Sequence, residues 1–356
     1  MNRIALFLPN WIGDVVMATP AIRAVREHHP GAELVAVCKP YVADVLAGSP
    51  WFQDTIHFDK RGPREQRLWS VARELRRSRT DAALLFPNSF RAALAARLGG
   101  GRDVIGFSRY GRRLLLSRAL HPKSDSWGRP VPLPAIDDYN RLALEVGTPD
   151  PGYRMELFTT PTDEAAARTV WNQFALHKYQ RVVGLNPGAA FGAAKHWPAE
   201  SFAHLARMLT QRLGCGVLVH CGPSEREMAR RIAEDSRSPH VFTMSDMPLS
   251  LGLTKTLVKR LDLLVTTDSG PRHFAAAFDR PVVTLFGPTH IEWTETYFEK
   301  AIHLQKKVPC GPCQKRVCPL DHRCMRDLSP EEVFAAAQRL LVRFPLPLSA
   351  EVRRAG

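Results

Sequence analysis

The segment Leu263–Ala277 (LLVTTDSGPRHFAAA) constrains the fold more than any other stretch of the chain. An apolar, β-branched run ends at Asp268, and an alanine-rich stretch with helical character follows Gly270. This order is typical of a buried strand, a tight turn and the start of a helix. Because the strand is apolar throughout and does not alternate, we expect it in a parallel sheet that is covered on both faces. The segment therefore predicts an α/β protein.

The turn at the end of this strand has the composition of an anion site. The first N–H groups of a helix are free to bind a ligand, and the helix dipole favours negative charge there. Ser269 and Gly270 allow the backbone to approach an anion closely, and Arg272 and His273 add donors. We interpret the turn as a cradle for a phosphorylated ligand. The alternative is that Asp268 only caps the helix.

The same alternation of strand and helix continues through both halves of the 356-residue chain, which is too long for one compact core. A cluster of breakers at Gly147–Gly152 (GTPDPG) indicates a linker between the halves. The predicted strands are Ile4–Leu8, Leu34–Val37, Thr55–Phe58, Ala82–Phe86 and Val104–Phe107, then Val182–Leu185, Val217–Cys221, Val241–Met244, Leu263–Thr267 and Val282–Phe286.

These elements predict two Rossmann-like domains whose parallel sheets face each other across a cleft. We place the first domain at residues 1–155 and the second at 156–330, with a helix over 331–345 and a flexible tail at 346–356. The start of that last helix carries a capping pattern, Ser329 followed by proline and two glutamates. Near the N-terminus we expect one helix over Val15–Glu27.

A net charge of +14 and a pI near 9.8 require an anionic partner or surface as an explanation. Much of the excess lies in Lys60–Arg79 and Arg102–Arg118. Nucleic acid, an anionic membrane, a phosphorylated substrate and simple solvated helix faces all fit this pattern. The chain has no apolar run of about 18 residues, and its N-terminus has no cleavage site of the kind that follows a signal peptide. We therefore expect a cytoplasmic protein without a membrane-spanning helix.

Asp14 follows the first predicted strand and lies at the start of the next helix. Its carboxylate either complements the helix dipole, which is worth about 0.3–1 kcal/mol, or acts as a general base toward a substrate hydroxyl. The loop before it has one glycine, and the chain contains neither the dinucleotide fingerprint nor a P-loop motif.

Two further residues follow strands of the second half. Lys195 precedes a helix at Ala199, and Glu225 follows a strand that ends in glycine and proline. A lysine of this kind is often a plain surface residue, and Glu225 is either a first-turn helix acid or a ligand of ribose hydroxyls. Their loops should leave the same carboxyl edge of one sheet as Ser269–His273.

Together these motifs resemble the ADP-heptose:lipopolysaccharide heptosyltransferases, glycosyltransferase family 9, which have the GT-B fold. Pro87–Phe90 and Phe191 are most similar to the heptosyltransferase II group. The matching motifs are Trp11–Asp14 (WIGD), Leu85–Phe90 (LFPNSF), Asn186–Gly188 (NPG), Lys195–Pro198 (KHWP), Thr267–Gly270 (TDSG) with His273, and Phe286–Thr289 (FGPT).

The resemblance implies an inverting transfer of a heptose from ADP-heptose to heptosyl-Kdo-lipid A, without a catalytic metal. Asp14 matches the catalytic base, Lys195 a donor-phosphate ligand and Glu225 the ribose ligand. The residues that match the turn for the donor diphosphate and sugar are Thr267, Asp268, Ser269, Gly270 and His273. A glycosidase needs a second carboxyl group to protonate its leaving group, but this transfer needs only one. ADP leaves readily once its developing charge is met by Lys195 and helix N–H groups.

The acceptor implied by the resemblance is a phosphorylated lipid at the inner face of the inner membrane. A cationic first domain would both bind acidic sugars and dock peripherally to that surface. The residues expected on the acceptor side are Asn88, Ser89, Arg109, Arg112 and Arg113, and Arg61 and Arg64 are further candidates for the basic surface. We expect no nucleic-acid partner, since aromatic residues do not interleave the basic stretches.

Two features depart from the family pattern. Pro271 and Arg272 replace a more usual apolar pair after Ser-Gly, which removes one N–H and adds a charged donor. Four cysteines also follow at C-x2-C-x4-C-x5-C spacing, namely Cys310, Cys313, Cys318 and Cys324. Structural zinc, an iron–sulfur cluster, disulfides and free thiols are all compatible with this spacing, with disulfides disfavoured in the cytoplasm.

Three other functions compete with this hypothesis. A transferase of the same fold could use another sugar nucleotide or acceptor, since nothing in the sequence reads the heptose itself. An epimerase or hydrolase of similar architecture would need further acid–base residues. A basic nucleic-acid-binding protein with a four-cysteine metal module would leave the strand-end motifs without a purpose.

Overall fold

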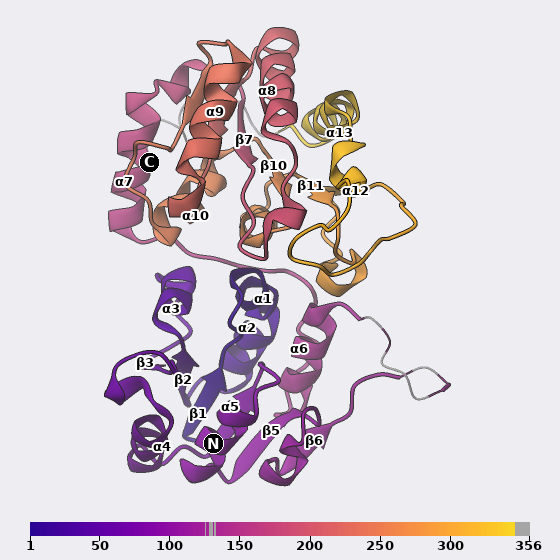
Figure 1. Ribbon diagram of the computed structural model, residues 1–356. Coiled ribbons are helices and arrows are strands. Elements are labelled where there is room, and N and C mark those ends of the chain that lie inside the picture. The colour runs from indigo at the N-terminus through magenta and orange to yellow at the C-terminus, as the bar shows by residue number, and fades with distance from the viewer. Residues whose placement is uncertain (125, 128–130, 132, 346–356) are drawn as a thin grey trace. The chain divides into compact units, whose positions relative to one another are not determined.

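The computed structural model describes residues 1–124, 126–127, 131 and 133–345, so the expected flexible tail at 346–356 lies outside the described residues. The chain divides into two compact units (Figure 1). Unit 1 comprises Met1–Phe158 and a returning segment, Glu292–Tyr297, and unit 2 comprises Thr159–Ile291 and the chain from Phe298 on. Sequence patterns did not indicate the return of Glu292–Tyr297 to unit 1.

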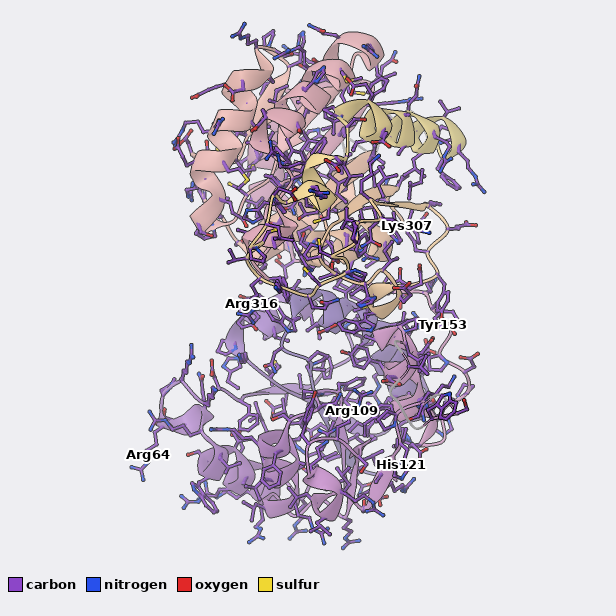
Figure 2. All side chains as sticks on the ribbon, turned by 45° about the vertical axis from the view of Figure 1, so that its right-hand side comes forward. Arg64, Arg109, His121, Tyr153, Lys307 and Arg316 are labelled. Carbon is purple, nitrogen blue, oxygen red and sulfur yellow. The ribbon has the colours of Figure 1, made fainter. Side chains whose placement is uncertain are left out.

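The returning segment is held to unit 1 through Tyr297. Its hydroxyl donates to Oδ2 of Asp137 at 2.9 Å, and its ring packs on that of Tyr153 with the ring centres 4.4 Å apart. Tyr153 is labelled in Figure 2. These contacts are made by side chains that lie far apart in the sequence, and local patterns do not reveal them.

Unit 1 is built on a six-stranded sheet in which all neighbouring strands are parallel. Its strands are almost wholly apolar and buried in the middle of the sheet, as the continuous apolar runs predicted. In spatial order they are β3 (Asp54–His57), β2 (Glu33–Cys38), β1 (Arg3–Phe7), β4 (Ala82–Leu85), β5 (Asp103–Phe107) and β6 (Arg118–Leu120).

Helices cover both faces of this sheet (Figure 1). On one face α4 (Leu68–Arg77) and the alanine-rich α5 (Phe90–Leu98) close the core. The remaining helices are α1 (Ile12–Met17), α2 (Thr19–His28), α3 (Pro40–Leu46) and α6 (Ala135–Leu144). The single helix expected over Val15–Glu27 is wrong, because the chain breaks at Ala18, just before Pro20 in the first turn of α2. A proline fits there since that position needs no N–H.

Unit 2 is built on a second six-stranded parallel sheet. In spatial order its strands are β12 (Ala301–Gln305), β11 (Val282–Phe286), β10 (Leu263–Thr267), β7 (Val182–Asn186), β8 (Gly216–Val219) and β9 (Val241–Thr243). Strands β7, β10 and β11 are buried along their whole length.

The helices of unit 2 also lie on both faces of their sheet (Figure 1). Helices α8, α9 and α13 pack together, and α7, α10 and α11 form the other layer. They are α7 (Pro161–Gln173), α8 (Ala199–Leu213), α9 (Arg226–Ser236), α10 (Leu251–Arg260), α11 (Gly270–Ala277), α12 (Arg323–Arg326) and α13 (Pro330–Arg343). The predicted capped start of the last helix is confirmed, since the Ser329 hydroxyl accepts from the Glu332 N–H and the Glu332 carboxylate from the Ser329 N–H.

Both sheets have the strand order 3-2-1-4-5-6 when each is counted from its own first strand. This is the order of the Rossmann fold, in which ligands bind at the carboxyl ends of the two central strands, where the strand order reverses. The predicted pair of Rossmann-like parallel sheets is therefore confirmed. The points of reversal lie between β1 and β4 in unit 1 and between β7 and β10 in unit 2.

Candidate active site

In unit 1, Asp14 lies in the first turn of α1, directly beyond the carboxyl end of β1. Its partly buried side chain lines a pocket of about 260 Å³. The pocket is also lined by Asn88 beyond β4 and by Asp138 and Tyr139 on α6. The reversal point of the unit 1 sheet thus carries an open pocket with a carboxylate at a helix start.

Asp138 and Tyr139 are pocket residues that the sequence motifs missed. Burial raises the pKa of Tyr139 well above its ordinary value, and the nearby charges of Asp14 and Asp138 add to this effect. Burial also raises the pKa of Asp138, although Arg141 and Arg109 oppose it. The pocket therefore places two carboxylates around a buried phenol. An amphipathic pattern in α6 shows that the helix has a buried face, but not which polar side chain faces a pocket.

Arg112 was expected on the acceptor side, and the structure corrects this assignment. Its side chain is fully buried, and its guanidinium donates to the carbonyls of Phe107 at 2.8 Å and Pro87 at 2.6 Å and to Oδ1 of Asn88 at 3.0 Å. Because these donors are bound within unit 1, Arg112 positions the loop after β4. It does not present its charge to a ligand.

The other expected acceptor residues differ in their settings. The hydroxyl of Ser89 accepts from the Ala92 N–H and caps α5, so this side chain also has a structural role. Asn88 keeps its place in the pocket wall. Arg113 is exposed, whereas Arg109 is partly buried, and its Nε is buried without a hydrogen-bond partner among the described residues. Figure 2 labels Arg109 in unit 1. Asn88, Arg109 and Arg113 thus remain candidates for contact with an acceptor.

In unit 2, Lys195 and Asp268 form a buried ion pair. Nζ of Lys195 lies 2.5 Å from Oδ2 of Asp268 and also donates to the Asp268 carbonyl at 2.9 Å. The ammonium additionally lies over the ring of Phe191, 4.9 Å from its centre. Asp268 follows β10, and Lys195 ends a short 3-10 helix that precedes α8. The pair therefore fixes two loops at the carboxyl edge of the same sheet.

Two more side chains hold the carboxylate of Asp268. The Thr289 hydroxyl donates to Oδ2 at 2.7 Å, and the buried Arg272 guanidinium lies 3.4 Å from Oδ1. Burial opposes ionisation of Asp268, but Lys195 and Arg272 outweigh it, so the pKa of this carboxyl lies below its ordinary value. Two cations thus lie around one anion beside the N-terminus of α11. This arrangement suits an anionic ligand.

The hydroxyls of the turn after β10 are engaged in a network that joins it to the loop after β7. Thr267 is fully buried, and its hydroxyl donates to the Gly188 carbonyl at 2.6 Å. The Asn186 amide donates to the hydroxyls of Thr266 and Ser269 at 3.0 Å each. The sequence motif that contains Asn186 did not indicate this role. Thr267 was expected to contact the donor, but its side chain instead fastens the two loops. Ser269 and the backbone from Gly270 on still form the start of α11.

Glu225 lies against the loop after β7. A Cβ built on Gly188 would come within about 2.0 Å of the Glu225 carboxylate, so residue 188 must be glycine for the carboxylate to lie there. The same carboxylate accepts from the Gly222 N–H at 2.8 Å. The structure thus brings Glu225 to the reversal point of the unit 2 sheet, next to the loop that Thr267 fastens.

His273 was expected to add a donor to the anion site, and this role stays a prediction. The side chain is buried, and burial, together with Arg272, lowers its pKa well below the ordinary value. Its Nδ1 is buried and has no hydrogen-bond partner among the described residues. A neutral imidazole adds no positive charge to the site, but its one ring N–H can still donate a hydrogen bond.

Comparison with known proteins decides the family. Residues 68–323 match the profile of glycosyltransferase family 9 (heptosyltransferase). The chain belongs to glycosyltransferase family 9. It is accordingly a glycosyltransferase, which agrees with an anion-binding turn in one unit and a carboxylate in a pocket of the other.

Relatives in this family match along almost the whole chain. It is 26% identical to lipooligosaccharide heptosyltransferase 2 of Campylobacter jejuni, covering 95% of this chain and 98% of the relative. It is 26% identical to lipopolysaccharide heptosyltransferase 2 of Escherichia coli, covering 96% and 99%. The solved structure of ADP-heptose lps heptosyltransferase II from E. coli covers 96% of this chain and 99% of its own, with a TM-score of 0.75 and 24% identity. This likeness confirms the predicted GT-B fold.

The segment Cys310–Cys324 of this family 9 chain lies beside the Lys195 loop. All four of its cysteines are free thiols, and all four line one small cavity. Burial raises the pKa of Cys324 to about 11, and the three other thiols add to the shift. Among the described residues no three potential ligands already have the arrangement of a metal site. Nor does the described part of the chain contain a helix long and apolar enough to cross a membrane.

Proposed function

We propose that the chain transfers a heptose from ADP-L-glycero-D-manno-heptose to heptosyl-Kdo-lipid A, with inversion at the anomeric carbon. The observation that carries this proposal is the buried cluster of Lys195, Asp268 and Arg272 at the N-terminus of α11. Its two cations lie at the reversal point of the unit 2 sheet, where a nucleotide diphosphate binds in folds of this kind. The names of the relatives support heptose as the sugar and lipopolysaccharide as the acceptor.

In the proposed reaction, unit 2 holds the donor. The cluster and the N–H groups of α11 meet the charge that develops on the diphosphate as the sugar leaves, and electrostatic stabilisation of this kind usually contributes more to catalysis than any other effect. Glu225 accepts hydrogen bonds from the ribose hydroxyls, as acidic residues do in related nucleotide sites. No step of this scheme requires a catalytic metal, since the protein's own cations and N–H groups supply the positive charge.

Asp14 of unit 1 is the proposed base. Its carboxylate takes the proton of an acceptor hydroxyl as that oxygen attacks the anomeric carbon, and the bond from this carbon to the ADP oxygen breaks. General base catalysis contributes about 10²–10⁴-fold to a rate. The pocket that Asp14 shares with Asn88 and Asp138 has the size and polar lining to hold part of a sugar. Arg109 and Arg113 supply cations for the phosphates of the acceptor.

The decisive experiment presents ADP-heptose with Kdo-lipid A that carries either no heptose or one heptose, and detects the products by mass spectrometry. We expect one heptose to be added only to the acceptor that already carries one. Transfer only to the acceptor without heptose would assign the first heptose to this enzyme. Transfer to neither would refute the proposed donor and acceptor while leaving the family assignment intact.

We also propose that unit 1 docks peripherally on an anionic membrane at the cytoplasmic face. The turn after β5 exposes Leu114 by 93% and Tyr110 by 76%, next to the exposed Arg113. Figure 2 labels Arg109 and Arg64, two further basic residues of this unit. Aromatic and apolar side chains beside cations suit the interface of an anionic bilayer.

Vesicle co-sedimentation tests this docking. Each lysine or arginine near an anionic surface contributes about 1 kcal/mol, which corresponds to about fivefold in binding. Arg113→Ala should therefore weaken binding to anionic vesicles about fivefold, and the matched control Lys178→Ala, an exposed cation of unit 2, should leave it unchanged. Equal binding by both variants and the wild type would refute a membrane role for this turn.

A further inference from the structure

The four residues Cys310, Cys313, Cys318 and Cys324 lie around one small space. They line a single cavity of about 20 Å³, together with Asp321 and His322. A cavity of about 10–15 Å³ holds one water molecule, so this space has room for a single ion. Four cysteines around such a space supply the ligand set of a tetrahedral site for a thiophilic metal.

The segment that carries the four cysteines is rich in cations. The stretch from Lys306 to Arg326 carries six lysine and arginine residues and a single acid, Asp321. Lys307 and Arg316, both labelled in Figure 2, belong to this group. Thiolates, not thiols, bind metals, and nearby cations stabilise them. Four thiolates around a divalent ion keep a net charge of −2, and a site of that charge suits a cationic segment.

The segment 306–322 has no helix or strand to fix its conformation, so other interactions must do so. Residues 306–322 contain no helix or strand, although they lie between β12 and α12. Irregular loops longer than about 12–15 residues are uncommon inside compact domains. A metal ion that binds residues from both ends of such a loop restricts it as a cross-link does. The cysteines lie near the start, in the middle and just after the end of this stretch.

The same segment is in direct contact with the loop that carries Lys195. The Ala194 N–H donates to the Arg316 carbonyl at 3.0 Å, and Nε2 of His322 lies 2.8 Å from the Ala194 carbonyl, to which it donates. Gly192 has a φ of +152°, and a Cβ there would lie 2.4 Å from the Arg316 carbonyl. Backbone meets backbone at this point, so a movement of the cysteine segment must move the loop.

Two cation–π contacts with the ring of Phe191 extend this contact to the ammonium of Lys195. Phe191 has the Lys195 ammonium 4.9 Å from its ring centre, and the Arg316 guanidinium is 5.7 Å from the same centre. Residues between Cys313 and Cys318 therefore touch the side chains that position the lysine of the proposed donor site. The cysteine segment and the Lys195 loop therefore contact each other directly, with no other element between them.

We propose that the four thiolates of Cys310, Cys313, Cys318 and Cys324 bind one thiophilic transition-metal ion, zinc or iron, and that this site positions the Lys195 loop for the donor. Binding releases the protons of those thiols that are not already ionised. Because Cys310 is exposed and the thiols do not yet have metal-binding geometry, the ion draws the ends of the segment inward. The metal site stands independently of the proposed function, whereas its effect on the donor rests on the proposed role of Lys195.

Metal analysis of the full-length protein, purified under reducing conditions, tests the site. We expect one zinc or one iron ion per chain by plasma mass spectrometry, which also distinguishes the two metals. The double variant Cys310→Ser/Cys313→Ser changes thiols on the outer side of the segment and should lose the metal while its circular dichroism spectrum is retained. The control Cys215→Ala, which changes a buried thiol just before β8 in unit 2, should keep it. A metal-free wild type, or disulfides found by alkylation and mass spectrometry, would overturn the proposal.

Binding of ADP, measured by calorimetry without any acceptor, tests the effect on the loop. We expect His322→Ala to retain the metal and to bind ADP about tenfold more weakly. Residues that orient a site through another residue typically change affinity or activity by about 10–100-fold, and we expect the lower end of this range. The control His204→Ala, an exposed histidine on α8, should bind ADP like the wild type. Loss of metal in His322→Ala would overturn the four-thiolate ligand set. Unchanged ADP affinity in both the metal-free double variant and His322→Ala would overturn the positioning role.

Discussion

The substitution Asp268→Asn removes the negative charge that Lys195 and Arg272 share in unit 2. All three side chains are buried, so the Lys195 ammonium is left in the interior without its ion-pair partner, and Arg272 loses one carboxylate contact. Removing one partner of a buried ion pair costs about 3–5 kcal/mol. Asparagine still accepts hydrogen bonds from Lys195 and Thr289 through its carbonyl oxygen. We therefore expect the free energy of unfolding of unit 2 to fall by about 3 kcal/mol, the lower end of this range.

This loss converts into a measurable change of melting temperature. Unit 2 has roughly 190 residues, and for a domain of about 150–250 residues a loss of 1 kcal/mol lowers Tm by about 2–4 °C. Scanning calorimetry should therefore show the transition of unit 2 about 6–12 °C lower in Asp268→Asn than in the wild type. The transition of unit 1, which does not contain the pair, should stay where it is.

The pH dependence of this loss follows from the pKa of Asp268. The folded state holds the pKa of Asp268 below its ordinary value of 3.8, so ionised Asp268 stabilises the fold at neutral pH. That contribution is complete above the ordinary pKa and is lost as the pH falls through the lower pKa of the folded state. The difference between wild type and variant should therefore be constant from pH 7 to about pH 5 and shrink below about pH 4.

Thr289→Val is the matched control for Asp268→Asn. It removes one hydrogen bond to the same carboxylate but leaves both cations paired, which should cost about 1 kcal/mol. Equal destabilisation by the two variants would refute the claim that the charge of Asp268 holds the turn. So would a difference between wild type and Asp268→Asn that persists unchanged at pH 3.

Further predictions concern both units. Asp14→Asn should lower kcat by at least about 10²-fold while leaving ADP affinity unchanged by calorimetry, and a loss of ADP binding would show a structural role instead. Arg112→Ala should destabilise unit 1 by about 3 kcal/mol or more, because it leaves buried carbonyls unpaired. The control Arg113→Ala should change the stability of unit 1 by no more than about 0.5 kcal/mol. Equal effects of the two variants in denaturant unfolding would contradict the buried role of Arg112. Glu225→Gln should weaken the binding of ADP but leave that of an ADP analogue without ribose hydroxyls unchanged, and parallel losses for both nucleotides would exclude the ribose contact.

Sequence patterns were sufficient for the central strands and for the loops that follow them. Strands such as β10 are continuous apolar runs with a sharp polar end, so their position and the turn after them are local features. Two of the four edge strands, β6 and β12, were missed for the opposite reason. β6 has three residues, and β12 is only half-buried along its length, so neither carries a strong apolar signal. Pairing with the strand that precedes each of them in the chain is what defines them.

Sequence reasoning about the site failed where burial decided the role of a residue. Arg112 was assigned to a ligand because charged side chains are mostly exposed, yet it is buried. Asp138 was missed, and Asn186 was quoted only as part of a motif, because their roles come from neighbours that are distant in sequence. A motif indicates which residue types gather at a strand end. It does not show which of them face the ligand and which hold the loop.

The contact between Gly188 and the Glu225 carboxylate restricts the order in which these two positions can change. A lineage that first replaces Gly188 passes through a protein in which a methyl group and a carboxylate compete for one volume. A lineage that first shortens Glu225 opens that volume, after which residue 188 is free to vary. The two positions are therefore expected to show sign epistasis, with substitution at 188 harmful beside glutamate and tolerated beside a smaller side chain. Efforts to change the nucleotide preference of this enzyme should begin at position 225.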